Sequence, residues 1–403
     1  MGKKVTGNLK MVIGPILTST KRVVLKLLRT GGVGFKLFGL PAKRIAVADT
    51  KKFFKDRVKN GYDYINYGKK DLTLEPAINT RGLDIPEARK YTYEHFMVSL
   101  PMGAYYHKHP SVITSDGCQL AIASNHPELS QEEHVLFQEI SLPRPETFKG
   151  CGLVLSTAND NNYYHCLFQI PPKKWLLEKH GLDLEEIDWY LLESSNSSFQ
   201  DEIITSLGID KSRIRDLKKH PHVRGERLLA LPAFWKPEPW ICDGLREVFL
   251  EEPGNEYAST QRLYISRNKA SYRRILNEPA LLEVLNRYGF RILQLEGLSI
   301  KEQARIFHSA EMIVSAHGAA LANTVFCKES TMVIEFRHAD HYSDLGGVYE
   351  HLSSICGLNH FTYLCEGEAV NPGDGKKFYD LRIDLESVER LLAGVFENED
   401  VAL

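Results

Sequence analysis

The segment HGAALAN (317–323) holds residues whose types and order could bind an anion. It follows EMIVSA (311–316), an apolar run that predicts a buried strand. Gly318 and Ala319 keep the turn into the next predicted helix free of large side chains, so a ligand can approach the backbone. The free N–H groups and the dipole of a helix N-terminus attract a phosphate, and His317 can donate to a phosphate oxygen or a ribose hydroxyl. The alternative is that these small residues only let a helix pack closely on a strand.

Further polar side chains follow the neighbouring predicted strands. Arg267 and Arg274 stand at and after the end of RLYISR (262–267), and their planar guanidinium groups suit a diphosphate. Ligands of an open parallel sheet bind beyond the carboxyl ends of its strands, so these arginines and His317 together predict a nucleotide diphosphate site. The alternative is that both arginines are surface residues. Ser299, Asn323 and Glu335 also stand at or after the ends of predicted strands.

Several well-known catalytic motifs are absent from the sequence. It contains no G-x-x-x-x-G-K-[ST] or G-x-G-x-x-G pattern, which argues against P-loop enzymes and standard dinucleotide enzymes. It also lacks G-x-S-x-G and H-E-x-x-H. Because there is no Asp-x-Asp pair, we expect no required metal and no cofactor, although Mg²⁺ can accompany a nucleotide.

Strands and helices alternate through the second half of the chain. The hydrophobic pattern predicts strands at 262–267, 290–296, 311–316 and 331–336, with helices at 277–287, from 299 to 310 and after 317. Ser299 and Glu302 form a capping-box pattern at the start of the second helix. Right-handed crossovers then predict an open, doubly wound α/β sheet. In the first half, we expect strands at 152–157, 189–194 and 227–232 and short extended runs over 92–156.

The length of 403 residues predicts two to three domains, at about 150 residues each. LPAFWKPEPW (231–240) carries three prolines and is the predicted linker. We therefore expect a basic segment at 1–48, an N-terminal domain at 49–235 and a C-terminal domain at 236–403. An apolar stripe predicts a final helix from about residue 384, which we expect to pack back on the first domain.

Charge is balanced over the whole chain but not along it. Lys and Arg number 50 against 52 Asp and Glu, so the broad basic field of a nucleic-acid-binding protein is absent. Residues 1–48 nevertheless contain ten Lys and Arg and no acid, interleaved with apolar residues. This pattern predicts contact with an anionic membrane surface, or else a solvated terminus.

The sequence carries no apolar run long enough for a spanning helix. Its seven cysteines form no C-x-x-C pair, which favours a reduced setting. We expect a cytoplasmic protein, peripheral on the inner membrane face through residues 1–48.

Four blocks of the sequence resemble glycosyltransferase family 61. They are NYYH (162–165), YISRNKASYRRILNE (264–278), LEGLS with EQ (295–303), and VSAHGAALANTVF (314–326) with VIEF (333–336). The resemblance, of the capsular or surface polysaccharide type, implies a GT-B fold, in which two Rossmann-like domains place their parallel sheets on either side of a cleft. It also implies inverting transfer of a hexosyl or pentosyl group from a nucleotide sugar.

The resemblance further implies roles for individual residues. The nucleotide and diphosphate site would be lined by Arg267, Arg274, Ser299, His317, Gly318, Ala319 and Asn323. Glu335 would meet ribose or sugar hydroxyls. The acceptor, a glycan or a lipid-linked saccharide, and the catalytic base would belong to the N-terminal domain.

His165 and Asp160 are the candidate bases. His165 has a pKa suited to proton transfer near neutral pH, and the alternative is a structural histidine packed among aromatic residues. Members of the family usually carry an Asp four residues after this His, where the present chain has Gln169, which cannot act as a base. Asp160, just after the predicted strand, is the other candidate.

Three functions are compatible with these patterns. The first is an inverting glycosyltransferase of polysaccharide biosynthesis. The second is a non-catalytic nucleotide-sugar-binding or scaffold protein of the same fold, which Gln169 favours. The third is a transferase that moves sulfate or phosphate from a nucleotide, since arginines at a helix N-terminus suit any phosphate donor.

Overall fold

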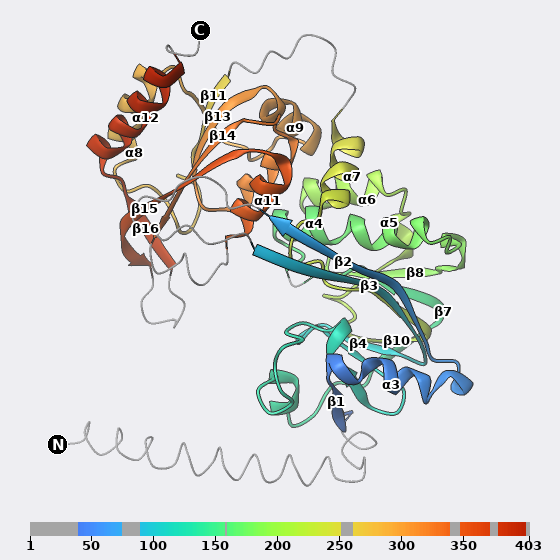
Figure 1. Ribbon diagram of the computed structural model, residues 1–403. Helices are drawn as coiled ribbons and strands as arrows, with labels where there is room; N and C mark the ends of the chain where they lie inside the picture. The colour runs from blue at the N-terminus through green and yellow to red at the C-terminus, as the bar shows by residue number, and fades with distance from the viewer. Residues whose placement is uncertain are drawn as a thin grey trace, which may run out of the picture.

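The chain forms two β-sheets with helices packed between and around them (Figure 1). The structure is a computed structural model that describes residues 39–74, 89–157, 159–250, 261–338, 347–370 and 378–399. The described strands of the first sheet end at Ala230, and those of the second begin at Gln261. The mixed α/β class expected from the sequence is confirmed, and both sheets contain parallel strands.

The first sheet has the strand order β1-β6-β5-β4-β10-β7-β8-β9, with β3 also paired to β10 and β2 paired to β3. Its parallel part is β10-β7-β8-β9, and β1 is parallel to β6. The bounds are β1 Lys43–Ile45, β2 Asp63–Leu74, β3 Arg89–Pro101, β4 Ala104–Tyr106, β5 Ser111–Ile113, β6 Cys118–Leu120, β7 Glu146–Val154, β8 Trp189–Leu192, β9 Ile214–Asp216 and β10 His222–Ala230.

The helices of the first half follow their sequence signals. Pro171 ends α4 (Tyr163–Gln169) and occupies the first turn of α5 (Pro171–Lys179), where a missing N–H costs nothing. Helix α6 (Ser198–Ser206) follows Ser197, which stands at the N-cap position without a side-chain capping hydrogen bond. The other two helices are α3 (Thr50–Lys55) and α7 (Pro239–Phe249).

The second sheet has the order β12-β11-β13-β14-β15-β16, parallel except for β16. The bounds are β11 Gln261–Ile265, β12 Arg291–Leu293, β13 Ala310–Ala316, β14 Met332–His338, β15 Asn359–Val370 and β16 Phe378–Arg382. Its helices are α8 Glu278–Arg287, α9 Ile300–His308, η8 Ala319–Phe326, α11 Val348–Cys356 and α12 Leu385–Glu399. The capping box between Ser299 and Glu302 is present at the start of α9, as predicted.

The parallel part of each sheet has a point where the chain reverses its direction of travel across the strands. In the first sheet, β8 and β9 lie to one side of β7, and β10 lies on the other. In the second sheet, β12 lies to one side of β11, and β13 lies on the other. Such switch points leave a crevice at the carboxyl ends of the two flanking strands, which is where open α/β sheets bind their ligands.

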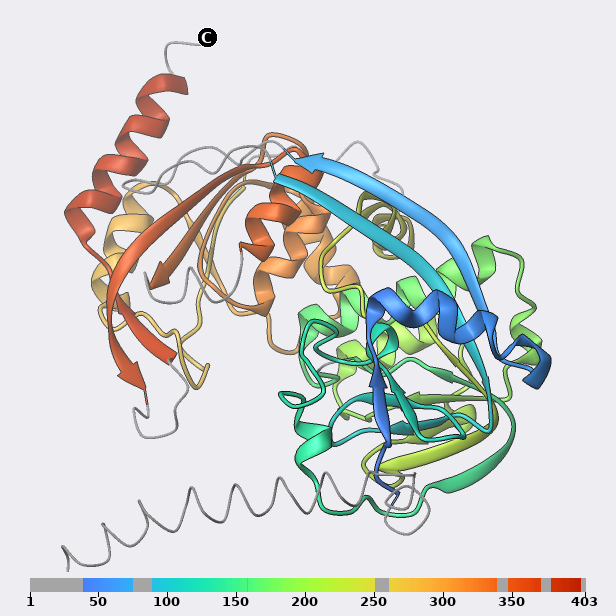
Figure 2. The ribbon, with the colours of Figure 1, turned by 60° about the horizontal axis from the view of Figure 1, so that its bottom comes forward.

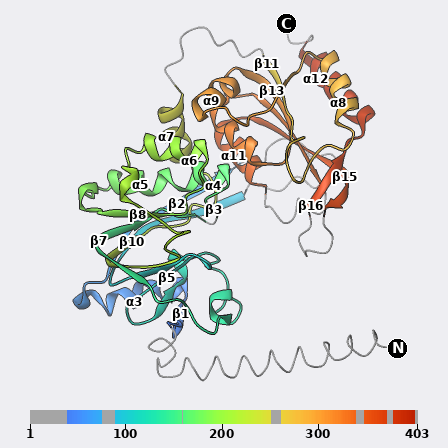
Figure 3. The ribbon, with the colours of Figure 1, turned by 180° about the vertical axis from the view of Figure 1, so that it is seen from behind.

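One apolar core is shared by both sheets. It includes Leu153 of β7, Ile203 of α6, Phe307 of α9 and Ile313 of β13. In Figures 1 and 3, helices α4, α5, α6 and α7 lie on the face of the first sheet that is turned toward the second. The two halves therefore pack through continuous side-chain contact, and the expected domain boundary at residue 235 stays a prediction.

The opposite faces of the two sheets carry separate cores. Phe53 and Phe54 of α3 pack with Val154 and Leu228 on the far face of the first sheet. Along β13, Ile313 belongs to the shared core, whereas its neighbours Met312 and Val314 point to the far face, as the two-residue period of a strand requires.

Helix α12 packs within the second half. Its side chains Val388 and Leu392 share the far-face core with α8, and the rings of Tyr288 and Phe396 stack with centroids 5.5 Å apart. The expectation that the final helix packs on the first domain was wrong, because its apolar stripe is covered by the neighbouring α8.

A long antiparallel ribbon, β2 with β3, extends from the first sheet to the second half (Figure 2). At its end, the Tyr93 hydroxyl lies 2.9 Å from Nε2 of His351 on α11, and both groups also contact the carbonyl of Pro237. The sequence predicted only short extended runs in this region.

Two further expectations need correction or restriction. The segment after His317 forms a 3-10 helix, η8, rather than the α-helix expected from its pattern. Most of the basic segment 1–48 lies outside the described residues, which begin at residue 39. Within the described part of the chain, no helix has the length and apolar character needed to cross a membrane.

Candidate functional site

The switch point of the second sheet brings Arg267 against Gly318. Arg267 follows β11, and Gly318 follows β13 after one intervening residue. A Cβ placed on Gly318 would lie 2.0 Å from Nη1 of Arg267 and 2.7 Å from its Cζ. Gly318 is fully extended, with φ 172°, so its backbone does not require glycine. The missing side chain instead leaves the space that the guanidinium group occupies.

A second guanidinium group reaches the same place from the loop after β11. Nη1 of Arg273 donates to the carbonyl of His317 at 3.4 Å. Arg273 holds φ at 60°, a left-handed conformation that is unfavourable for a residue with a side chain. Strain of this kind is kept where the surrounding structure fixes a side chain in a functional position.

Neither of these guanidinium groups has a carboxylate within ion-pair distance in the described part of the chain. Within the described residues, no carboxylate forms an ion pair with Arg267 or Arg273, and the buried Nε atom of each has no hydrogen-bond partner. Burial lowers the pKa of both, and for Arg273 the charge of Arg267 lowers it further. The two guanidinium groups donate only to the carbonyls of Tyr272 and His317 in the described part of the chain, and such an arrangement is suited to an anion that presents several oxygens.

His317 belongs to a buried hydrogen-bonded chain. Its Nδ1 contacts one oxygen of Glu335, whose other oxygen lies 3.1 Å from Nε2 of His360. Nδ1 of His360 in turn contacts the Ser353 hydroxyl at 2.9 Å. Burial works against ionisation of Glu335, but His317, His360 and Arg337 outweigh it and hold its pKa below the usual range. The chain thus surrounds an ionised carboxylate.

The ionised Glu335 determines which proton His317 carries. A carboxylate only accepts hydrogen bonds, so His317 donates through Nδ1 and keeps its second nitrogen, Nε2, for another partner. In the described part of the chain, Nε2 has no such partner. Burial lowers the pKa of His317, and the charges of Arg337 and Arg273 lower it further against the opposing effect of Glu335. Without a ligand, Nε2 is therefore a hydrogen-bond acceptor.

The NYYH segment of α4 lies directly against this site. The Tyr163 hydroxyl donates to Oδ1 of Asn323 at 2.6 Å. The rings of Tyr164 and Tyr349 meet edge to face with centroids 5.9 Å apart, and Tyr349 lies 5.0 Å from the His317 ring. Segments that are 160 residues or more apart in the sequence are thereby joined at the end of the second sheet.

Asn323 serves as the fixed link in this arrangement. Its Nδ2 donates to Oε1 of Gln303 at 2.8 Å and to the carbonyl of Ala320 at 3.2 Å, so both N–H groups are used. The residue is fully buried. Asn323 therefore holds the site together and has no N–H group left for a ligand.

His165 has a partly unsatisfied environment. Its Nδ1 and both amide atoms of Gln169 are buried, and none of the three makes a well-aligned hydrogen bond. Burial lowers the pKa of His165, while Gln169 and Asp160 act in the opposite direction. The ring lies 5.5 Å from that of Tyr164 and 6.2 Å from that of Trp235. The ring is thus held by aromatic packing, and burial favours its neutral form.

Asp160 has a structural environment. Its carboxylate accepts hydrogen bonds from Thr157 N at 2.6 Å, the Ser156 hydroxyl at 2.7 Å and Glu193 N at 2.9 Å. Only 2% of the residue is exposed. The carboxylate ties together the turns that follow β7 and β8 and is covered from solvent.

Two expected ligands of the diphosphate are engaged elsewhere. Arg274 forms a two-point ion pair with Asp380, through Nε at 3.0 Å and Nη2 at 2.6 Å. Its neighbour Arg273 is the residue that reaches His317. The Ser299 hydroxyl donates to Glu302 at 2.8 Å, and the N-terminus of α9 that it caps also binds the carboxylate of Glu202 from α6.

Several residues of this arrangement were not expected from the sequence. Arg273 directly precedes Arg274, which was the predicted ligand, and nothing in the sequence distinguishes the two arginines. His360 and Tyr349 lie on elements for which no pattern indicated a role. In the described part of the chain, no group of three or more His, Cys, Asp or Glu side chains is placed to hold a metal ion.

Comparison with known proteins assigns the sequence that forms this site to a family. The sequence model of glycosyltransferase family 61 matches residues 93–334, which is more than half of the chain. The match includes the NYYH segment, both switch points and the HGAALAN segment. No curated protein gives a significant match. The chain belongs to glycosyltransferase family 61.

Proposed function

We propose that this protein transfers a sugar from a nucleotide-sugar donor to the hydroxyl group of a glycan or lipid-linked saccharide, with inversion at the anomeric carbon. One observation carries the proposal: at the switch point of a parallel sheet, Arg267 and Arg273 place two guanidinium groups that form no ion pair with any described carboxylate. The diphosphate of a nucleotide sugar supplies the missing negative charges. Membership of the family adds that the transferred group is a sugar.

The arginines stabilise the leaving diphosphate. As the bond between the anomeric carbon and the phosphate oxygen breaks, charge accumulates on that oxygen, and fixed donors lower the energy of this state. The charge of the bound diphosphate also raises the pKa of His317, so that Nε2 takes up a proton and becomes a donor. The N–H groups of Ala319 and Ala320 precede the first 3-10 hydrogen bond, which Leu321 makes to Gly318, and add two further donors.

His165 acts as the base in this proposal. The acceptor oxygen attacks the anomeric carbon on the face opposite the diphosphate and forms the new bond as the old one breaks. The hydroxyl proton passes to the imidazole of His165. Its low pKa suits a base that is unprotonated at neutral pH. Asp160 is the poorer candidate because its oxygens are buried and already accept three hydrogen bonds.

The finer expectations of the fold belong to this proposal. We infer that the two sheets form a GT-B arrangement, with donor and acceptor meeting between their switch points. The contacts of α4 with η8 and α11 support this arrangement. The proposal also includes a role in polysaccharide biosynthesis and a cytoplasmic location. It further includes attachment to an anionic membrane through residues 1–48. We expect no required metal.

The proposal is tested with a panel of UDP-, GDP-, CMP- and dTDP-sugars. A ligand present at about 100 times its Kd stabilises the fold by about 2.7 kcal/mol, which a melting curve detects. We expect stabilisation by one nucleotide class, lost in Arg267→Ala and Arg273→Ala, and a product of inverted anomeric configuration by NMR. Absence of stabilisation by every nucleotide sugar contradicts the proposal.

Gln169 supports a second candidate, a binding protein without turnover. A buried, unpartnered amide stands where family members usually have a carboxylate, and a Gln cannot hold a protonated imidazole by charge. Nucleotide-sugar binding without transfer or hydrolysis would favour this candidate. Gain of turnover in Gln169→Asp would then identify the missing group.

A further inference from the structure

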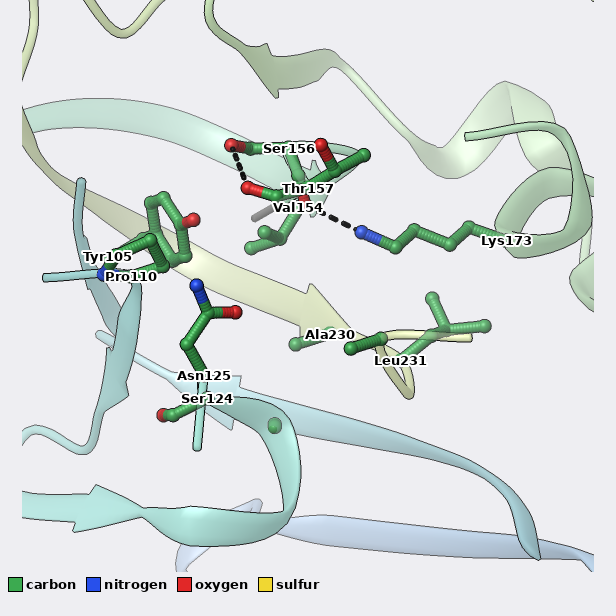
Figure 4. Close-up of a pocket in the computed structure, with 12 residues that line it drawn as sticks. Tyr105, Pro110, Ser124, Asn125, Val154, Ser156, Thr157, Lys173, Ala230 and Leu231 are labelled. Atoms are coloured by element: carbon green, nitrogen blue, oxygen red, sulfur yellow. Dashed lines mark hydrogen bonds between the residues drawn. The ribbon is translucent and has the colours of Figure 1, made fainter. Parts of the chain in front are cut away.

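The switch points of the two sheets differ in the room that they offer to a ligand. At the first, the ends of β7 and β10 border a pocket with an enclosed volume of about 30 Å³ (Figure 4), enough for about two water molecules. The ammonium group of Lys173 lines this pocket and donates to the carbonyls of Leu155 at 3.0 Å and Ser156 at 2.6 Å. The first switch point is therefore too small for a diphosphate.

The second switch point holds a tyrosine whose hydroxyl is unused. Only 4% of Tyr349, on α11, is exposed. In the described part of the chain its hydroxyl makes no hydrogen bond, and it is not one of the fully covered polar atoms that lack a partner. The small exposed part of the residue therefore includes the hydroxyl oxygen. The hydroxyls of Tyr163 and Tyr164 on α4, by contrast, each have a protein acceptor. Since a buried tyrosine usually has a partner for its hydroxyl, the free group on Tyr349 indicates a partner that arrives with a ligand.

The ring of Tyr349 is fixed from both halves of the molecule. It meets the ring of Tyr164 edge to face, with centroids 5.9 Å apart, and its centroid lies 5.0 Å from that of His317. One turn later on the same face of α11, Ser353 bonds at 2.9 Å to His360, a member of the buried chain that includes His317. The position of the hydroxyl is therefore set before a ligand binds.

The charges around Tyr349 are those of the anion site. Burial raises the pKa of Tyr349, and the charge of Glu335 adds to this effect. Arg273, Arg267 and Arg337 act in the opposite direction but do not outweigh burial. The hydroxyl therefore stays protonated at neutral pH and can donate a hydrogen bond. Because two of these arginines bind the diphosphate in the proposed function, the hydroxyl lies beside the same anion.

Tyr349 also lies on the side of the anion site that faces α4. Its ring contacts Tyr164, which directly precedes the proposed base His165. In the proposed reaction the sugar lies between that base and the diphosphate, so the phosphate oxygen nearest to α4 is the one bonded to the sugar. A donor on this side meets the oxygen on which charge accumulates as the bond to the sugar breaks.

We infer that the Tyr349 hydroxyl donates a hydrogen bond to this oxygen of the diphosphate, as a substrate contact beside Arg267 and Arg273. The inference rests on the proposed glycosyltransferase function. It adds a residue beyond the stretch 93–334 that the family model matches. A hydroxyl suits this position because, unlike a third cation, it adds a donor without further repulsion between like charges. Its hydrogen bond also strengthens as the oxygen becomes negative.

Tyr349→Phe tests the inference, because it removes the hydroxyl and keeps the ring contacts. No protein group loses a partner, so we expect the melting temperature of the free protein to stay unchanged. The affinity for inorganic pyrophosphate, measured by isothermal titration calorimetry on the full chain, should fall about tenfold or more, as for any lost hydrogen bond to a charged group. Tyr288→Phe is the matched control: the Tyr288 ring packs on Phe396 in the far-face core, and this variant should bind pyrophosphate like the wild type.

A second comparison identifies the oxygen. UDP, GDP and dTDP present the former leaving oxygen with its full charge, whereas in the corresponding nucleotide sugars that oxygen is bonded to the sugar. Tyr349→Phe should therefore weaken binding of the nucleoside diphosphate more than binding of its nucleotide sugar. In protein that carries ¹³Cζ-labelled tyrosine, the signal that is missing from Tyr349→Phe should shift when pyrophosphate is added to the wild type.

The outcomes separate this inference from the proposed function. Equal affinities of wild type and Tyr349→Phe for pyrophosphate overturn the inference, and so do equal losses for a nucleoside diphosphate and its nucleotide sugar. In both cases nucleotide-sugar binding by the wild type leaves the proposed function standing. Pyrophosphate binding that depends on Tyr349, without binding of any nucleotide sugar, refutes the proposed function alone. Absence of binding by all of these anions refutes both.

Discussion

Replacing Gly318 by alanine should weaken nucleotide binding without weakening the fold. The added Cβ would lie 2.0 Å from Nη1 of Arg267, well inside the contact distance of the two atoms. The obstructing atom is the far end of a flexible side chain, so the guanidinium group can move aside. At φ 172° the backbone accepts alanine without strain, and we expect the melting temperature of the free protein to change by no more than about 2 °C.

The size of the binding loss follows from the contact that is displaced. A hydrogen bond between a charged group and a charged partner contributes about 1.5–3 kcal/mol. Loss of the Arg267 contact should therefore weaken binding of the nucleotide sugar about 10- to 150-fold. Arg267→Ala should cost a similar amount, and it should not destabilise the free protein, because it removes one of two unpaired like charges.

A double-mutant cycle gives this prediction its sharpest form. If Gly318→Ala acts through Arg267, the variant carrying both changes binds the nucleotide sugar no more weakly than Arg267→Ala alone. Isothermal titration calorimetry on the four proteins measures the cycle. Losses that add in the double variant would refute the reasoning, and so would wild-type affinity in Gly318→Ala.

Three further predictions concern the hydrogen bonds and titrations of the site. Tyr163→Phe leaves Oδ1 of Asn323 buried without its donor, so the free energy of unfolding should fall by about 1–3 kcal/mol in a urea titration; an unchanged value would mean that water replaces the hydroxyl. His165→Ala should abolish sugar transfer without changing the melting temperature. Asp160→Asn should lower the melting temperature but leave the turnover per folded molecule unchanged. The reverse pattern would make Asp160 the base. Because burial keeps the pKa of His317 low in the free protein and a bound diphosphate raises it, the protonated form binds more tightly. Affinity for the nucleotide sugar should therefore rise as the pH falls, and His317→Gln should remove this dependence. An equal pH dependence in both proteins would show that another group takes up the proton.

The sequence predicted strands β11 to β14 of the second sheet because local signals mark these elements, whereas β15 and β16 were not predicted. Ser299 and Glu302 cap α9, and Pro279 stands in the first turn of α8. Short apolar runs with glycine between them then fix the order of strands and helices. The structure places His317 and Arg267 at the ends of neighbouring strands, as the sequence indicated, since position at a strand end is a property of the chain order alone.

Other features depend on partners that are remote in the sequence. Whether Arg273 or Arg274 serves the anion site is decided by Asp380, which lies on β16 about a hundred residues later and binds Arg274. The apolar stripe of α12 could have packed on the first domain or on α8, and its sequence alone does not decide between them. The length of the β2–β3 ribbon was missed because much of it is polar or aromatic and shows little alternation.

The shared core has a consequence for how the two sites are spaced. Helix α4 follows β7 of the first sheet, and through Tyr163 it is bonded to η8 at the end of the second. The interval between the proposed base and the diphosphate is therefore set by close-packed side chains, with little freedom for one half to swing relative to the other. In such a molecule, a substitution that changes the volume of a side chain in the shared core should alter the distance between the two substrates, even when the substituted residue contacts neither of them.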